Sequence, residues 1–369
     1  MIKWELKKLW SYKPVVWLLL AMIVLNIGQI IYQNYPNLHG ELYIGRQKIN
    51  QLVEGKITQE KYETLLKYYQ DASQKVAIGD YQTDKIDENT FSGYVFGDSQ
   101  ILEEVVNEYQ KCLDYQKDIQ RIIDKAKENL TFSKDKSWNE YNQKIISSYQ
   151  NRSLSYYYDY TIMNSYVNYD FSYLLILVIV VFMTVCIFIH EKKDTQIYFS
   201  LVKNGIKRSF FPKLTALFIS TLLVVILFAI QNFIVFYLLG TNNGWLQPIY
   251  ALQQFRLSDS TISIVVYHLI DTIFKCLGSL IFSLILVFIY NFLKKDYLGI
   301  LIGAGLIVAM IFIYNLHNYS VISFSSIREL IINNNMNSYI FVIAMLIIIC
   351  GSIINYFGYV WWQNHEKNT

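Results

Sequence analysis

Long apolar runs alternate with polar segments along this chain. Six of the runs reach or approach the ~20 residues that a helix needs to cross about 30 Å of hydrocarbon. They cover residues 14–33, 173–190, 214–239, 272–293, 297–316 and 338–362. Because backbone amides in hydrocarbon must find partners within their own segment, and a barrel strand needs only about 10 residues, the runs predict six transmembrane helices.

The first run, 14–33, is read as a retained membrane anchor. Its basic start is typical of a signal peptide, but the run is longer than the about 7 to 15 apolar residues of a signal-peptide core, and no small-x-small cleavage site follows it before Asn34. The composition agrees with a membrane protein, because 53% of the residues are hydrophobic and 17% are charged.

Lys and Arg gather in the short segments on one side of the predicted helices. Segment 1–13 carries four lysines, segment 191–213 carries six basic residues, and Lys294 and Lys295 lie between the fourth and fifth runs. Cytoplasmic loops accumulate such residues. We therefore expect a multi-pass protein of the plasma membrane with both termini in the cytoplasm, and with four transmembrane helices and a short tail in 214–369.

Segment 34–172 is expected to lie outside the cell as a helical domain between the first two transmembrane helices. It contains 16 Lys and Arg against 21 Asp and Glu, while the rest of the chain contains 16 against 8. Apolar residues recur at three- and four-residue steps in 59–76 and 99–130, which predicts amphipathic helices paired in hairpins. Three glycines mark a turn-rich linker between these helices: Gly79, Gly93 and Gly97.

Tyrosines crowd the end of this domain, before the second apolar run. They could form an interfacial belt, because rings with a polar group favour the headgroup region. The alternative, somewhat less favoured, is the general abundance of Tyr and Asn that is typical of an AT-rich genome.

The first ten residues and segment 191–213 both contain amphipathic patterns. At the N-terminus one helical face, about 100° wide, carries Ile2, Leu6, Leu9 and Trp10. This pattern predicts an interfacial helix. In segment 191–213, Asp194 or Thr195 can cap a short helix that ends at Gly205 and presents an apolar face. That face requires a lipid or protein partner.

Chemistry-bearing motifs are missing from the sequence. It contains no phosphate-binding GxxxxGK[ST], no zinc-binding HExxH and no GxSxG nucleophile motif, and its five histidines and four cysteines are scattered. Asp271, Lys275 and His268 could form a polar stripe on one helical face, but we favour a Lys275 side chain that reaches water at the outer membrane boundary. The chain is not expected to be an enzyme or to bind a metal.

Together these features resemble the membrane (permease) subunit of a type-2 ATP-binding-cassette (ABC) exporter. Such permeases have an amphipathic elbow helix, six transmembrane helices and a coupling helix in the loop between the second and third. The loop matches at Glu191, Thr195, Ser200, Leu201, Gly205, Arg208 and Lys213. It departs from the family at Asp194, where a glycine is common, and at Pro212, which lies later than the usual proline.

The resemblance implies that ATP and Mg²⁺ are bound by separate ABC-type ATPase subunits, which dock on the coupling loop, and that this chain binds no cofactor. It implies a second permease copy, identical or a sister chain, in contact with membrane lipid, and no nucleic acid. Arg208 and Lys213 would face phospholipid or the ATPase. The large outer domain is similar to that of a Gram-positive subset of these exporters. Members of this subset either export peptides such as bacteriocins and lantibiotics or protect the cell against them. Gly299 and Gly303, at GxxxG spacing, predict close helix packing.

Two other classes of function remain open. One is a membrane sensor or immunity protein that transports nothing, whose outer domain binds a ligand and whose loop binds another cytoplasmic partner. The other is a membrane-embedded enzyme, which would need paired carboxylates or histidines within the apolar runs. The runs lack such pairs, so the enzyme is the least favoured of the three.

Overall fold

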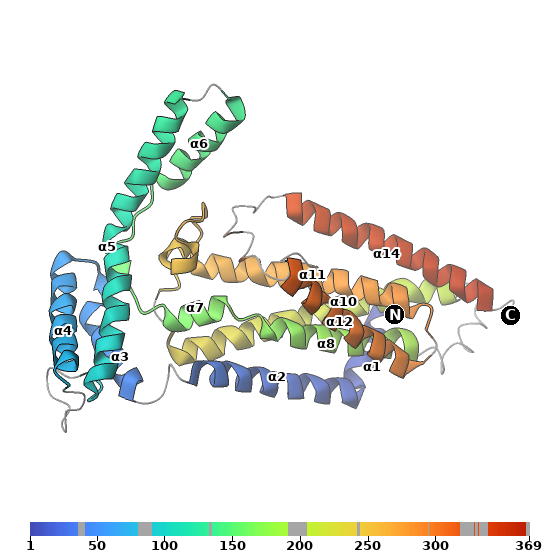
Figure 1. Ribbon diagram of the computed structural model, residues 1–369. Coiled ribbons are helices and arrows are strands. Elements are labelled where there is room, and N and C mark those ends of the chain that lie inside the picture. The colour runs from blue at the N-terminus through green and yellow to red at the C-terminus, as the bar shows by residue number, and fades with distance from the viewer. Residues whose placement is uncertain are drawn as a thin grey trace. The chain divides into compact units, whose positions relative to one another are not determined.

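Figure 1 shows the computed structural model of the chain. It describes residues 1–35, 41–79, 91–132, 135–190, 205–241, 244–293, 295–317, 328, 331 and 339–366. These residues are mostly helical, as predicted, and they form two compact units. Unit 1 comprises Met1–Ile30, Asn168–Val235 and Val266–Thr369, and unit 2 comprises Ile31–Val167 and Phe236–Val265.

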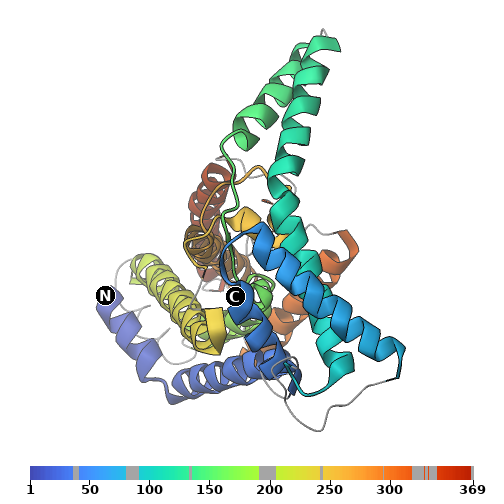
Figure 2. The ribbon, with the colours of Figure 1, turned by 90° about the vertical axis from the view of Figure 1, so that its left-hand side faces the viewer.

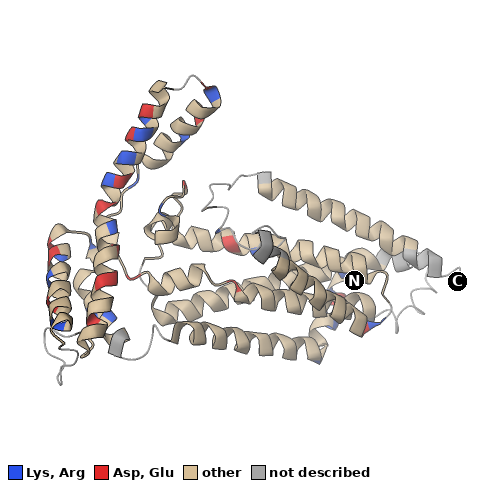
Figure 3. Ribbon diagram, in the orientation of Figure 1, with Lys and Arg blue, Asp and Glu red and all other residues tan. Residues whose placement is uncertain are grey.

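Unit 1 contains the long apolar helices. Its elements are α1 (Ile2–Ser11), α2 (Lys13–Asn34), α8 (Phe171–Val185), the π-helical turn η2 (Cys186–His190), α10 (Gly205–Phe236), α11 (Ile264–Tyr290), α12 (Asp296–His317) and α14 (Tyr339–Glu366). Figure 3 shows the long helices of this unit, which exclude the ten-residue α1, almost free of charged residues. Charge is costly in hydrocarbon, so this composition suits a membrane interior.

Five helices in the described part of the chain are long and apolar enough to cross a membrane. They are Lys13–Asn34, Thr161–Ile189, Ser209–Gly240, Ile264–Tyr290 and Ile340–Trp361. They correspond to five of the six predicted transmembrane helices. The remaining one, predicted at 297–316, corresponds to α12, whose described apolar part, Asp296–Phe312, is shorter.

The helix α8 is the most enclosed of the five. Of its apolar stretch 78% is buried, against 17% for α2 and 11% for α14. The side chains around it form the core of unit 1, in which Leu177, Ile179 and Val180 are completely buried. The apolar faces of α2 and α14 therefore remain largely uncovered within this chain.

Unit 2 is built on one long helix. Its helices are α3 (Glu41–Val53), α4 (Gln59–Ala77), α5 (Val95–Phe132), α6 (Lys136–Tyr149) and α7 (Thr161–Val167). The strands β1 (Gly55–Lys56) and β2 (Tyr156–Tyr157) pair antiparallel. Short turns η3 (Tyr237–Thr241), η4 (Ile249–Ala251) and η5 (Gln253–Phe255) complete it.

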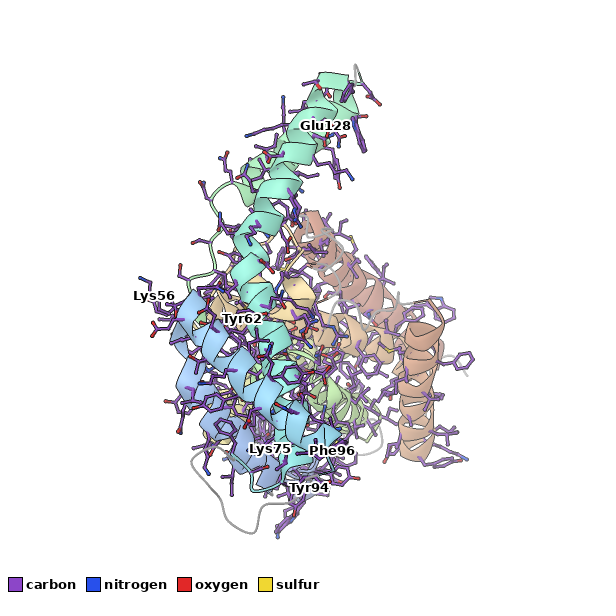
Figure 4. The ribbon with its side chains drawn as sticks, turned by 60° about the vertical axis from the view of Figure 1, so that its left-hand side comes forward. Lys56, Tyr62, Lys75, Tyr94, Phe96 and Glu128 are labelled. Carbon is purple, nitrogen blue, oxygen red and sulfur yellow. The ribbon has the colours of Figure 1, made fainter. Side chains whose placement is uncertain are left out.

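The two hairpins of unit 2 share α5. Figures 1 and 2 show α3 and α4 against its first half and α6 against its second half. Figure 4 shows the same order along the helix, with Tyr94 and Phe96 at the start of α5, Glu128 near its other end, and Tyr62 and Lys75 on the neighbouring α4. The prediction of helical hairpins is confirmed for this segment.

Local sequence signals explain where these helices begin. The Thr58 side chain accepts a hydrogen bond from Lys61 N at 3.4 Å before α4, and Asp135 accepts one from Ser137 N at 2.9 Å before α6. Both are N-cap interactions. Gly79 and Gly93 have positive φ, of 82° and 79°, and flank the ends of α4 and α5. The assignment of Gly97 to the linker was wrong, because Gly97 lies within the first turn of α5.

The segment between α10 and α11 belongs to unit 2. Its Tyr250 ring stacks on Tyr115 of α5, with centroids 5.6 Å apart, and its Ser258 carbonyl accepts a hydrogen bond from Arg152 Nη1 at 2.6 Å. Arg152 is 2% exposed, and its guanidinium lies 4.0 Å from the centre of the Tyr149 ring. We call Tyr115, Tyr149, Arg152 and Tyr250 the arginine anchor. Periodicity within 34–172 gave no sign that 236–265 would join this unit.

Candidate functional site

Four of the seven predicted coupling residues lie outside the described residues: Glu191, Thr195, Ser200 and Leu201. Gly205, predicted to end the coupling helix, is the first residue of α10, and Arg208 lies in the first turn of that helix. Lys213 is only 5% exposed. The expectation that the Lys213 side chain faces phospholipid or an ATPase is therefore wrong, because the chain itself covers it.

The two ends of the basic loop are joined by aromatic side chains. Phe188 in η2, just before the loop, packs against Phe210, which lies near the other end of segment 191–213 in α10, with ring centroids 6.1 Å apart. Phe210 also contacts Tyr359 and Tyr356 of α14, at 5.1 and 5.9 Å. We call these four residues the stem cluster. These contacts bring α10 and α14 together with η2, the turn that follows α8, where the loop begins and ends. Aromatic pairs at such distances stabilise packing beyond their buried area.

The helix α8 does not end regularly at the stem cluster. The five residues that follow it form the π-helical turn η2, and two residues before that turn Thr184 Oγ1 donates to the Val180 carbonyl at 2.7 Å. Wide turns of this kind are frequent at functional sites, and Thr side chains bonded to the preceding turn often bend helices. The loop therefore leaves α8 from an irregular helical end.

Gly299 and Gly303 face α8 and η2. A Cβ atom at Gly303 would lie 2.5 Å from Val181 Cγ1 and 2.6 Å from the Tyr290 hydroxyl, whereas a Cβ at Gly305 would meet nothing within 4 Å. The Tyr290 hydroxyl donates to the Gly299 carbonyl at 2.6 Å. The backbone of α12 thus approaches α8 more closely than any residue with a side chain allows.

The four predicted elbow residues do not share one environment. Leu9 is buried in the core of unit 1, Leu6 and Trp10 are half-buried, and Ile2 is 40% exposed. The Trp10 Nε1 atom donates to Ser220 Oγ of α10 at 3.2 Å. The expectation that this face lies in the headgroups is wrong for Leu9, because the protein covers it.

Charged side chains of α11 pair with each other. Lys275 Nζ lies 2.7 Å from Asp271 Oδ2, one turn away, and both side chains are nearly buried. Near the start of α8, Arg328 Nη1 donates to Asn168 Oδ1 at 2.9 Å and lies 3.8 Å from Asp170 Oδ2. The structure thus favours a paired polar stripe over a Lys275 that extends into water.

Sequence reasoning missed the stem cluster and a polar contact between α2, α8 and α10. Asn26 and Asn232 are hydrogen-bonded to each other, and Ser172 and Tyr169 extend the contact; we call these four residues the asparagine bridge. Asn26 and Asn232 could have been singled out as amides inside apolar runs. The aromatic residues of the stem cluster carry no comparable signal.

No metal-binding group accompanies these contacts in the described part of the chain. Within the described residues, no group of three or more His, Cys, Asp or Glu side chains could hold a metal ion, and the four cysteines, all described, are free. Comparison with models of protein families, with curated proteins and with solved structures finds no match. Any functional assignment therefore depends on the residues of this chain.

Proposed function

We propose that this chain is the permease subunit of an ABC transporter. It would form the path for ATP-driven export of a peptide or another amphipathic substrate, or for self-protection against one. A separate ATPase that holds ATP and Mg²⁺ would dock on the 191–213 loop in the cytoplasm. In this proposal the chain crosses the plasma membrane six times, with α12 as the fifth crossing, α1 as the elbow helix and residues 34–172 outside the cell.

The stem cluster is the observation that supports this proposal most strongly. Phe210 contacts Phe188 at the other end of the loop and Tyr356 and Tyr359 on the last helix. A force applied to the loop would therefore act on α8, α10 and α14 together. Coupling of this kind requires that the loop bind the ATP-bound and ATP-free states of the partner with different affinity.

The uncovered face of α14 supports a second permease copy or lipid as its neighbour. Large apolar side chains of this helix are exposed in the single chain: Val342, Ile343, Met345, Leu346, Ile349, Ile353, Ile354 and Phe357. A soluble protein rarely exposes so much contiguous apolar surface, whereas a transmembrane helix does so wherever it meets lipid or another helix.

Co-purification tests the proposed partner. The chain is tagged and purified from its native membrane, and its bound proteins are identified and quantified. We expect a cassette-type ATPase without transmembrane helices, in stoichiometric amount, and its loss in Leu201→Asp. The control is Leu246→Asp, at a position of unit 2 that is 84% exposed and outside the loop.

Either of two results would reject the permease. One is a sensor kinase as the partner, or no partner at all, which would favour the sensor or immunity protein. The other is ATPase binding that Leu201→Asp and Leu246→Asp leave equally intact, because the loop would then not be the docking site.

Labelling of single cysteines tests the proposed topology. In a chain whose four native cysteines are replaced, Lys136→Cys at the exposed start of α6 should react with a membrane-impermeant maleimide in intact cells. Ser200→Cys in the loop should react only after the cells are permeabilised. Labelling of Ser200→Cys in intact cells would place the loop outside and overturn the topology.

A further inference from the structure

Ionisable side chains from three segments of unit 2 lie near one another in a partly buried region. Glu54 directly follows α3, Glu108 lies on α5, and Asp159 lies two residues before the start of α7. Glu54 Oε1 lies 3.5 Å from Asp159 N, and the Tyr157 hydroxyl lies 3.5 Å from Glu108 Oε2. We call Glu54, Glu108 and Asp159 the carboxylate cluster. All three are half-buried, so the cluster reaches the surface.

Asp159 has a structural role within the cluster. Its Oδ1 accepts a hydrogen bond from Thr161 N at 2.9 Å and its Oδ2 accepts one from Asn50 Nδ2 at 2.7 Å. Among the described residues, Glu108 has only the long hydrogen bond from Tyr157. Within the same residues, Glu54 likewise has only one long hydrogen bond, from Asp159 N at 3.5 Å. The oxygens of Glu108 and Glu54 are therefore the ones available to a ligand.

Buried polar atoms around the cluster lack hydrogen bonds. Within the described residues, Asn50 Oδ1, the Tyr160 hydroxyl and Arg256 Nε are buried without a partner, and Asn50 and Tyr160 are only 4% and 8% exposed. The Asn50 amide is held at the cluster by its bond to Asp159, and the Tyr160 hydroxyl is close enough to Glu54 and Arg256 to feel their charges. Such orphaned atoms normally have partners in a complete site.

The charge of the cluster is not balanced by its neighbours. Three carboxylates face two arginines, and Arg46 is shared with Glu104, with which it forms an ion pair. Burial raises the pKa of Glu108, and the Asp159 carboxylate raises it further, against the opposing effect of Arg46 and Arg256. Burial also raises the pKa of Glu54. Both shifts are caused mainly by burial. The charge count, three carboxylates against two arginines of which Arg46 is shared with Glu104, is what favours a cation here.

A metal ion does not fit this site, because the arginines lie among the carboxylates and the described residues offer no metal-binding group. A primary ammonium fits better, since it provides three donors and no acceptor. Glu108, Asn50 Oδ1 and the Tyr160 hydroxyl can accept from it. Arg256 Nε still needs an acceptor, which the carbonyl next to an α-ammonium group supplies.

We propose that the carboxylate cluster binds the free N-terminus of a peptide. The α-ammonium group lies between Glu108, Asn50 and Tyr160, and the first peptide carbonyl accepts from Arg256 Nε. This inference deepens the proposed function by naming a peptide terminus as the ligand, but the binding step needs neither an ATPase nor transport.

Calorimetric titration of the purified full-length chain in detergent, without an ATPase, tests the inference. The probes are trialanine amide, its N-acetylated form, and N-acetyl-lysine amide, which carries a primary ammonium without an adjacent carbonyl. We expect the free tripeptide to bind at least ten-fold more tightly than either acetylated probe. Glu108→Gln and Tyr160→Phe should each weaken this binding several-fold.

The matched control is Glu103→Gln, an exposed carboxylate on the same helix, which should leave the affinity unchanged. Unfolding temperatures of all variants are measured in parallel, so that loss of fold is not mistaken for loss of binding. Equal affinity for the free and acetylated tripeptides, or no binding by the folded chain, would overturn the inference. Tighter binding of N-acetyl-lysine amide would overturn the assignment to a peptide terminus.

The failure of this inference and that of the proposed function can be told apart. Binding of the free tripeptide by a chain that co-purifies with no ATPase would leave the site standing and reject the permease. Co-purification of the ATPase with a chain that does not bind the tripeptide would support the permease and reject the peptide-binding site.

Discussion

Asn26 Nδ2 on α2 donates a hydrogen bond to Asn232 Oδ1 on α10 at 2.8 Å. The Asn232 amide in turn donates to Ser172 Oγ at 2.9 Å, and the Tyr169 hydroxyl donates to Asn26 Oδ1 at 2.8 Å. Both asparagines are buried among apolar helices. In such surroundings an amide without a partner is costly, so this asparagine bridge fixes how α2, α8 and α10 align.

Breaking one side of the bridge should destabilise unit 1. We expect Asn26→Leu to cost about 1–2 kcal/mol, because Asn232 Oδ1 loses its donor and the Tyr169 hydroxyl keeps only the longer of its two hydrogen bonds to Asn26, the one to the carbonyl. The double variant Asn26→Leu/Asn232→Leu should cost less than the sum of the two single changes. Chemical denaturation in detergent measures both, and strictly additive costs would contradict a direct interaction.

The close approach of α12 to α8 should tolerate no side chain at Gly303. We expect Gly303→Ala to cost about 1–3 kcal/mol, because its Cβ would clash with Val181 and the Tyr290 hydroxyl. Gly305→Ala, on the same helix with open space around it, should be neutral or slightly stabilising. Thermal unfolding of the two variants is the measurement, and equal unfolding temperatures would refute the contact.

The arginine anchor should hold the segment between α10 and α11 in unit 2. Arg152→Met keeps most of the side-chain volume but removes the hydrogen bonds to the Ser148 and Ser258 carbonyls. We expect a loss of about 2–4 kcal/mol and faster proteolysis near Leu257, whose side chain is exposed. Arg121→Met is the control, since the Arg121 side chain is 80% exposed and its ion pair within the described residues is with its helical neighbour Asp118. It should change stability by less than about 0.5 kcal/mol.

Glu108 should make the stability of unit 2 depend on pH. Its pKa is raised in the folded state, mainly by burial. The stability that protonated Glu108 contributes is therefore fully present below the unfolded-state pKa, near 4.5, and is lost as the pH rises through the folded-state pKa.

The variant Glu108→Gln cannot ionise, so it should flatten this profile and raise the unfolding temperature at pH 7.5. A gain of about 1 kcal/mol corresponds to roughly 2–4 °C for a unit of this size. Unfolding temperatures recorded from pH 4 to pH 8 give the profile. A wild-type profile that Glu108→Gln leaves unchanged would mean that another group titrates.

The apolar runs predicted the positions of the long helices because the length and hydropathy of a run are local properties of the sequence. Periodicity likewise predicted α4 and α5, whose apolar residues recur on one face. The same reasoning failed at Lys213 and Leu9, where burial depends on which helices happen to cover them. It also left Glu54, Glu108 and Asp159 unremarked, because residues so far apart in the chain share no spacing that would connect them.

The sequence by itself determined that this protein is helical, that its long helices are apolar enough for a membrane, and that a charged helical segment lies between the first two. These follow from the sum of many local preferences. Only the tertiary structure decided that Phe188 meets Phe210, that Asn26 pairs with Asn232, and that residues 236–265 join the unit built on α5. Each of those depends on packing between distant segments, where shape and a few polar partners select one arrangement among many of similar hydrophobicity.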